Sequence, residues 1–214
     1  MYLSKITLNP RNPGVRSDIT RPYELHRTLK RAVDGAGGGN RLLFRVEPPN
    51  GRHMPGPVVL VQSSNVEPTW GWIQKNDYAL NVQGPKHVTL KLVRDQRLAF
   101  RLVGNPTKKV NGKRIPLSHA VRQHAEDRTY YDWLARKARQ HGFEVLRVQG
   151  APFHTGVARQ KRKQYDKADI PHFGVRFDGL LRVTDPDRLA EAVRNGIGPA
   201  KAFGFGLVSL APAR

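Results

Sequence analysis

The side chains with the clearest chemical potential lie within residues 21–33 of this 214-residue sequence. Four polar residues there are spaced i, i+3, i+4 and i+7, and they are Tyr23, His26, Arg27 and Lys30. That spacing places them on one face of a helix. An imidazole exchanges protons near neutral pH, and neighbouring cations stabilise negative charge that develops on a phosphate. The set therefore suits RNA cleavage by internal transesterification, in which a ribose 2′-OH attacks the adjacent phosphorus.

Each member of this set has an expected role in that reaction. His26 would be the general acid that protonates the leaving 5′-oxygen, and Arg27 or Lys30 would stabilise the phosphorane. A phenol, with a reference pKa of about 10, is a poor base at pH 7, so Tyr23 is expected to position the 2′-OH or help to activate it. The spacing alone leaves open a solvated basic helix face that does no chemistry.

A second cluster is purely basic and lies in a polar stretch between two predicted strands. It contains Arg159, Lys161, Arg162 and Lys163, and Lys167 continues it. Cations on an extended hairpin can follow an RNA phosphate backbone. The alternative is a solvated basic loop with no partner, and a charge run by itself carries no sequence specificity.

A third feature is a glycine-rich segment near the C-terminus that leads into a predicted last strand. Its glycines are Gly196, Gly198, Gly204 and Gly206, with Lys201 between them. Neither a P-loop nor a dinucleotide fingerprint matches this segment. Backbone N–H groups at glycines can approach a phosphate closely, and Lys201 would add charge. The alternative is a tight loop in which glycine is required only by the backbone geometry.

The charge balance points to a polyanionic partner. The sequence has 37 Lys and Arg against 17 Asp and Glu, so its formal net charge is +20. Such a surplus attracts nucleic acid first and an acidic membrane surface second, and it opposes self-association. We therefore expect a nucleic-acid-binding protein that is a monomer when it is outside any larger complex.

Several classes of chemistry find no support in the composition. The sequence has no cysteine, no HExxH motif and no clustered carboxylates, so we expect neither a metal site nor a cofactor. The apolar runs are too short to span a bilayer, and the N-terminus lacks the pattern of a secretion signal. We expect a cytoplasmic protein without a membrane partner.

The first cluster needs a helix, which we predict over Arg21–Val33. Thr20 is its expected N-cap, and Pro22 fits its first turn, where a missing N–H costs little. Leu25 and Leu29 belong to an apolar stripe on the side largely opposite the polar cluster. The helix would pack this stripe on a sheet and turn the polar cluster to solvent.

The remaining elements alternate between strands and helices in two similar orders. In the first half a strand at 2–8 is followed by a turn-rich break at Asn9–Gly14, the helix over 21–33, and strands at 41–46, 57–62 and 78–82. The second half has strands at 97–103, 143–148 and 203–210, helices at 118–141 and 186–195, and two strands within 172–183 joined by a hairpin turn at Asp178-Gly179.

A composition break at Gly84–His87 places the predicted domain boundary near residue 92. This division gives an N-terminal domain over residues 1–92 and a C-terminal domain over residues 93–214. The element order predicts an α+β protein of two tandem ferredoxin-like, RRM-like βαββαβ domains with antiparallel sheets. That architecture is a common platform for RNA, although a fold alone does not define a function.

The sequence resembles the CasE-type CRISPR RNA endonucleases, the repeat-processing subunits of type I-E Cascade. The segments that carry the resemblance are Met1–Asn9, Pro22–Leu29, Val59–Gln62 and Gly196–Leu207. The two most specific pieces are the Tyr-x-x-His pattern at Tyr23 and His26 and the C-terminal glycine-rich segment. The resemblance covers the whole chain in order and length.

The resemblance implies a fold and an activity. It implies tandem ferredoxin-like domains and metal-independent cleavage at the base of a repeat stem-loop, leaving a 2′,3′-cyclic phosphate and a 5′-hydroxyl. Catalysis would fall on Tyr23 and His26, and a basic hairpin that grips the stem would fall on Arg159–Lys163. The expected partners are CRISPR repeat RNA, the mature crRNA and other Cascade subunits. A non-catalytic RNA-binding protein, or a silent Cascade subunit, would use the same basic surface and remains the alternative.

Overall fold

The chain folds into two compact units. The computed structural model describes residues 1–34, 40–48, 55–117, 129–155 and 172–213. Unit 1 contains Met1–Thr89 and also Lys201–Gly204, whereas unit 2 contains Leu90–His154, His172–Ala200 and the chain from Phe205 onward. A short segment from late in the sequence therefore packs with unit 1. Among the described helices, none is long and apolar enough to cross a membrane.

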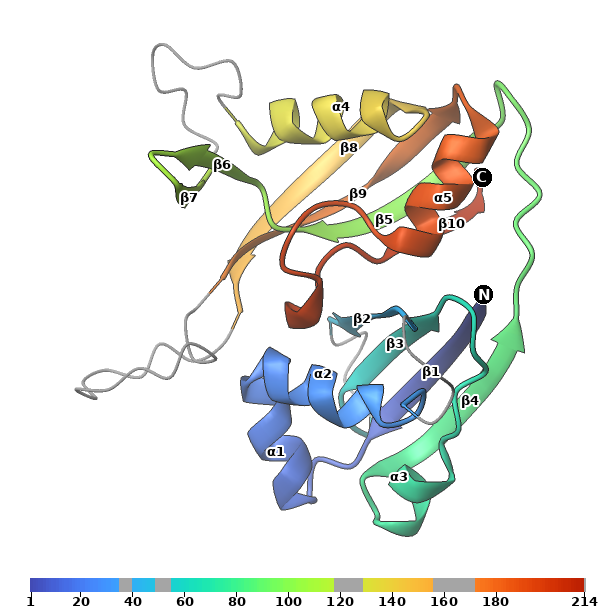
Figure 1. Ribbon diagram of the computed structural model, residues 1–214, viewed down its shortest axis with the longest axis vertical. Helices are drawn as coiled ribbons and strands as arrows, with labels where there is room; N and C mark the ends of the chain where they lie inside the picture. The colour runs from blue at the N-terminus through green and yellow to red at the C-terminus, as the bar shows by residue number, and fades with distance from the viewer. Residues whose placement is uncertain (35–39, 49–54, 118–128, 156–171, 214) are drawn as a thin grey trace. The chain divides into compact units, whose positions relative to one another are not determined.

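Unit 1 is a four-stranded antiparallel sheet with helices packed on it (Figure 1). The strand order is β2-β3-β1-β4, which is the order of a ferredoxin-like βαββαβ unit. The strands are β1 (Tyr2–Leu8), β2 (Leu42–Glu47), β3 (Val58–Ser63) and β4 (Ala79–His87), and the helices are α1 (Pro13–Thr20), α2 (Pro22–Lys30) and α3 (Gly71–Lys75).

The core of unit 1 lies between α2 and the sheet. Ile6 and Leu8 of β1 and Leu25 and Leu29 of α2 are fully buried in it. Alternate residues of a strand share one face, so β1 buries Ser4, Ile6 and Leu8 as its pattern predicts. The apolar side of α2 is thereby fixed against the sheet, and its polar side faces outward.

Unit 2 repeats the same topology. Its sheet order is β10-β5-β9-β8, and the element order of that sheet and its helices is again βαββαβ. The elements are β5 (Arg97–Gly104), α4 (Tyr130–Gln140), β8 (Phe143–His154), β9 (Phe173–Val183), α5 (Pro186–Asn195) and β10 (Val208–Pro212), with a separate hairpin of β6 (Thr107–Val110) and β7 (Lys113–Pro116). The predicted α+β class with two tandem ferredoxin-like domains and antiparallel sheets is confirmed.

The start of the chain differs from the prediction by one helix. The segment expected as a break contains the beginning of α1, because Pro13 fits a first helical turn and the Asn12 side chain accepts hydrogen bonds from Gly14 N at 2.8 Å and Val15 N at 3.3 Å. Thr20 ends α1 instead of capping α2. The predicted cap is therefore wrong, and Arg21 precedes α2 without a side-chain cap.

The helix predicted over 118–141 begins later than expected. Thr129 has extended dihedral angles, φ −129° and ψ 167°, and forms a capping box with Asp132, so α4 starts at Tyr130. Residues 118–128 lie outside the described part of the chain. The predicted stop is close, since α4 ends at Gln140 and Gly142 follows with a positive φ of 73°.

Two turn signals in the sequence lie inside strands. Asp178-Gly179 does not form a hairpin turn, because β9 runs unbroken from Phe173 to Val183. A Cβ at Gly179 would lie 2.1 Å from the carbonyl oxygen of Arg147, where β8 has a register shift, so a close backbone approach requires this glycine. The break expected at Gly84–His87 is likewise the end of β4, which also pairs with a register shift.

Candidate active site

The polar face of α2 carries the predicted catalytic pair. The rings of Tyr23 and His26 are stacked with centroids 6.4 Å apart and an interplanar angle of 27°. Tyr23 is 38% exposed, and His26 is half-buried. The structure thus brings these two side chains together on an accessible face, with a phenol and an imidazole within reach of one bound group.

Asp18 fixes the orientation of α2. Its carboxylate accepts a hydrogen bond from Thr28 Oγ1 of α2 at 2.6 Å and another from the Tyr78 hydroxyl at 2.8 Å. Burial and the neighbouring Asp18 charge raise the pKa of Tyr78, so its hydroxyl remains a donor. One carboxylate therefore ties α1, α2 and the start of β4 together.

Two aromatic side chains support the pair. Phe44 of β2 is fully buried, and its ring centroid lies 6.1 Å from that of His26. Phe203 lies in a short 3-10 turn, η2 (Lys201–Phe203), and its ring centroid lies 5.7 Å from that of Tyr23. The two catalytic candidates thus rest on rings supplied by segments far away in the sequence.

The surroundings of His26 weaken its hold on a proton. Partial burial lowers the pKa of His26 below its usual value, the charge of Lys30 lowers it further, and Asp34 acts in the opposite direction. In the free protein the imidazole is therefore neutral over a wider pH range than an exposed histidine. Its protonated form is a correspondingly stronger proton donor.

The two cations of the cluster differ in their surroundings. Arg27 forms an ion pair with Glu24, with 3.0 Å between Nη1 and Oε2, and its side chain is 66% exposed. Lys30 lies one helical turn beyond His26 and is close enough to influence it. Lys30 is therefore the better placed of the two to stabilise charge beside the imidazole.

The glycine-rich segment places its residues in unlike surroundings. Gly204 N–H donates to Lys201 O at 3.2 Å, and Gly206 N–H donates to Val103 O at 2.8 Å. A Cβ at Gly198 would lie 2.9 Å from the Trp133 ring. These bonds and contacts favour the alternative that the glycines are required by the backbone geometry rather than by a phosphate.

Positive φ angles also interrupt the strand predicted over 203–210. Gly204 and Gly206 have φ values of 85° and 93°, so the strand begins only at Val208. Gly196 likewise has a positive φ of 73° at the end of α5, where its N–H donates to Ala192 O. Lys201 lies in η2 and belongs with unit 1.

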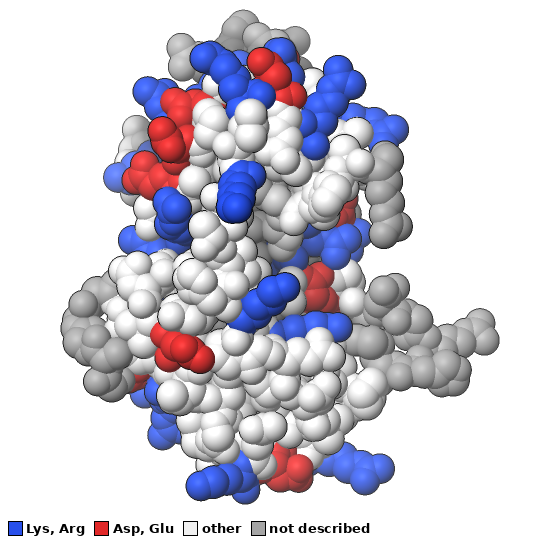
Figure 2. All heavy atoms as spheres, turned by 90° about the vertical axis from the view of Figure 1, so that its right-hand side faces the viewer, with Lys and Arg blue, Asp and Glu red and all other residues white. Residues whose placement is uncertain are grey.

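The basic cluster of Arg159, Lys161, Arg162 and Lys163 lies outside the described residues, as does Lys167. Other Lys and Arg side chains are spread over the face drawn in Figure 2, with Asp and Glu interspersed among them. Among the described residues, no group of three or more His, Asp or Glu could hold a metal ion.

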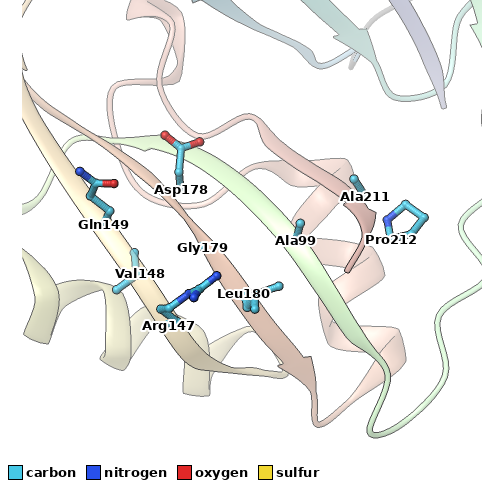
Figure 3. A pocket seen from close by; sticks show the side chains of 9 residues that line it. All are labelled: Ala99, Arg147, Val148, Gln149, Asp178, Gly179, Leu180, Ala211 and Pro212. Atoms are coloured by element: carbon cyan, nitrogen blue, oxygen red, sulfur yellow. The ribbon is translucent and has the colours of Figure 1, made fainter. Parts of the chain in front are cut away.

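A hollow of about 720 Å³ lies on the sheet of unit 2 (Figure 3). Its most polar lining residues are Arg147, Gln149 and Asp178, and the Asp178 carboxylate accepts hydrogen bonds from Arg101 Nε at 2.5 Å and Arg176 Nε at 2.8 Å. Within the described part of the chain, its lining contains no histidine. The hollow offers an ion-paired carboxylate, whereas the predicted catalytic residues Tyr23 and His26 lie on α2.

Sequence spacing identified the members of α2 but missed the residues that hold them. Phe44 and Phe203 carry no motif, and only their place in the fold brings them to Tyr23 and His26. Asp18 had one available signal, since an acidic residue shortly before a predicted helix often makes a local hydrogen bond. Nothing in the sequence indicated that it would also accept from Tyr78.

Comparison with known proteins places the whole chain in one group. A sequence model of the family described as "CRISPR associated protein" matches residues 1–212. The chain is 37% identical to the CRISPR-associated endoribonuclease Cse3 of Thermus thermophilus, over 99% of this chain and 100% of the relative. It is 29% identical to the CRISPR system Cascade subunit CasE of Escherichia coli, again over 99% and 100%. A solved structure of CRISPR endoribonuclease Cse3 bound to a 19-nucleotide RNA matches with a TM-score of 0.83 and 38% identity, covering 99% of this chain and all of that one.

Proposed function

The chain belongs to the Cse3/CasE family of CRISPR-associated endoribonucleases, and from this premise we propose that it cleaves CRISPR precursor RNA at the base of the repeat stem-loop. The reaction is metal-independent transesterification by the ribose 2′-OH. One observation carries the proposal: Tyr23 and His26 stack on an exposed helix face beside Lys30, in a chain that matches an endoribonuclease over its full length.

The reaction forms one bond and breaks one. The 2′-oxygen attacks the adjacent phosphorus and gives its proton to solvent water, and the bond from phosphorus to the 5′-oxygen breaks. The protonated imidazole of His26 gives its proton to the departing 5′-oxygen, so the products are a 2′,3′-cyclic phosphate and a 5′-hydroxyl. Tyr23 positions the 2′-OH by hydrogen bonding, and Lys30 stabilises charge on the phosphorane.

The negative substrate also adjusts the donor. In the free protein, burial and Lys30 hold the pKa of His26 low. A bound phosphate places negative charge beside the imidazole, which favours the protonated form. RNA binding therefore favours the protonated imidazole that donates its proton to the 5′-oxygen.

RNA binding in this proposal rests on charge. The formal net charge of +20 favours a polyanion, and the relative Cse3 has been solved with RNA bound. Arg159, Lys161, Arg162 and Lys163 contact the phosphates of the stem. Lys201 adds a further cation beside Gly198, Gly204 and Gly206, whose part is to shape the loop that presents it.

The cleaved RNA stays bound to the protein, and the two together form part of a larger assembly. The relative CasE is a Cascade subunit, and we assign this chain the same place, with the mature crRNA held through its stem. Outside the complex the protein is a cytoplasmic monomer. Because the cleaved RNA is retained, turnover is slow and cleavage is best measured with protein in excess.

Replacement of His26 by alanine tests the assignment. Loss of a general acid lowers the single-turnover cleavage rate by roughly 10²–10⁴-fold, while affinity for the RNA stays within a few-fold of wild type. His87→Ala is the matched control, because His87 is an exposed histidine at the end of β4 outside the α2 cluster, and this variant should keep the wild-type cleavage rate. A wild-type protein that binds the repeat RNA tightly without cutting it would instead be a non-catalytic RNA-binding subunit.

A further inference from the structure

Among the described residues, Phe203 is the one side chain from outside α2 whose ring packs against that of Tyr23, in a tilted arrangement. The centroids lie 5.7 Å apart with an interplanar angle of 33°, within the range in which aromatic pairs attract. Phe203 and Tyr23 both belong to unit 1, although 180 positions separate them in the sequence. The contact therefore depends on the short segment Lys201–Gly204, which joins unit 1 from late in the sequence.

The backbone around Phe203 is shaped to present its ring. Ala200 has a positive φ of 60°, and Gly204 has a positive φ of 85°, so the residues on both sides of η2 have positive φ angles. An alanine in that region is strained, and such strain is held only where the surrounding structure imposes it. The turn that carries Phe203 is thus preceded by a strained residue, Ala200, and followed by a glycine, which adopts a positive φ without strain.

The same turn also borders the support of His26. A Cβ at Gly204 would lie 3.2 Å from Cε2 of Phe44, and Phe44 packs on His26. The residue after Phe203 thus fits closely against Phe44. The loop therefore contacts Tyr23 directly through Phe203, and it borders His26 indirectly, because Gly204 packs against Phe44 and Phe44 packs against His26.

We propose that Phe203 is a positioning residue, whose ring holds the phenol of Tyr23 in the orientation that meets the 2′-OH. This inference rests on the proposed function and names the device that aligns it. Tyr23 is 38% exposed, and within the described part of the chain its hydroxyl forms no hydrogen bond, so ring packing is the contact that restricts it. Without Phe203, the phenol samples orientations that do not reach the nucleophile.

A double-mutant cycle tests the coupling. We expect Phe203→Ala to lower the single-turnover rate about three- to tenfold at saturating protein, with unchanged affinity for a 2′-deoxy RNA that cannot be cut. In a Tyr23→Ala background the same change should cost less than about twofold, since Phe203 acts through Tyr23. Phe203→Tyr retains the ring and should restore most of the rate.

A second readout does not depend on cleavage. The Phe203 ring current acts on Tyr23, so Phe203→Ala should move the Tyr23 ring signals in the NMR spectrum of tyrosine-labelled protein, assigned with Tyr23→Phe. Equal rate losses in both backgrounds, or unmoved Tyr23 signals, would overturn the proposal. A wild-type protein that fails to cleave would overturn the proposed function instead, and the NMR signals would still test the positioning.

Discussion

Substitution of Gly204 by alanine probes how tightly the proposed catalytic pair, Tyr23 and His26, is held. Gly204 has a positive φ of 85°, and an added Cβ would lie 3.2 Å from Cε2 and 3.4 Å from Cζ of Phe44. Ordinary contacts of that kind begin at 3.4 Å, so the loop or the Phe44 ring must move by a few tenths of an ångström. Phe44 is fully buried and packs against His26, so a movement of the Phe44 ring also displaces His26.

The expected effect on the rate follows from that displacement. A misplacement of 1 Å costs roughly 100-fold in rate, so a displacement of about 0.3 Å costs roughly fourfold. We expect Gly204→Ala to lower the single-turnover rate about three- to tenfold. The strained backbone also lowers the free energy of unfolding by about 1–2 kcal/mol, which a domain of ordinary stability tolerates.

Gly112→Ala supplies the matched control. Gly112 also has a positive φ, 77°, but a Cβ there would meet nothing within 4 Å. The control should therefore lose a similar free energy of unfolding and keep the wild-type cleavage rate. Thermal unfolding and single-turnover cleavage of both variants separate the two effects. Equal cleavage by both variants would refute the claim that the loop holds the site.

The remaining predictions concern charge. Lys30→Gln removes a cation that lowers the pKa of His26, so the limb on which cleavage falls with rising pH should move to higher pH; Asp34→Asn should move it to lower pH. His26 titration by NMR in the free proteins should give the same two signs, and movement in one direction for both variants would contradict the assignment. The pKa of His26 is lower in the folded chain than in the unfolded chain. The contribution of neutral His26 to the free energy of unfolding is therefore fully present above its pKa in the unfolded chain, and it is lost as the pH falls through its pKa in the folded chain. Replacement of the four cations within 159–163 by glutamine should weaken binding of the repeat RNA and flatten its salt dependence, because fewer counterions are released; an unchanged slope in filter binding would show that they do not contact phosphate.

The helix face could be predicted because its pattern is local. The spacing from Tyr23 to Lys30 and the apolar stripe at Leu25 and Leu29 define both sides of α2 within two turns. The alternating strands and their order likewise predicted both sheets. These features depend on periodicity, which a single sequence displays directly.

The support of the site could not be predicted because it is made by distant contacts. Phe203 reaches Tyr23 only after the chain has passed through most of unit 2, and Phe44 reaches His26 only through the sheet of unit 1. The wrong hairpin at Asp178-Gly179 has a similar origin. Gly179 is required by the close approach of the backbone of the neighbouring strand β8, and the sequence shows only the Asp-Gly dipeptide.

The most direct test of the account is cleavage of a repeat hairpin RNA in EDTA, beside the same RNA with one 2′-deoxy nucleotide at the mapped break. The account predicts a single cut in EDTA that leaves a 2′,3′-cyclic phosphate and disappears with the deoxy substitution, because the attacking 2′-oxygen is then missing. Cleavage that survives the deoxy substitution would contradict the chemistry assigned to Tyr23 and His26.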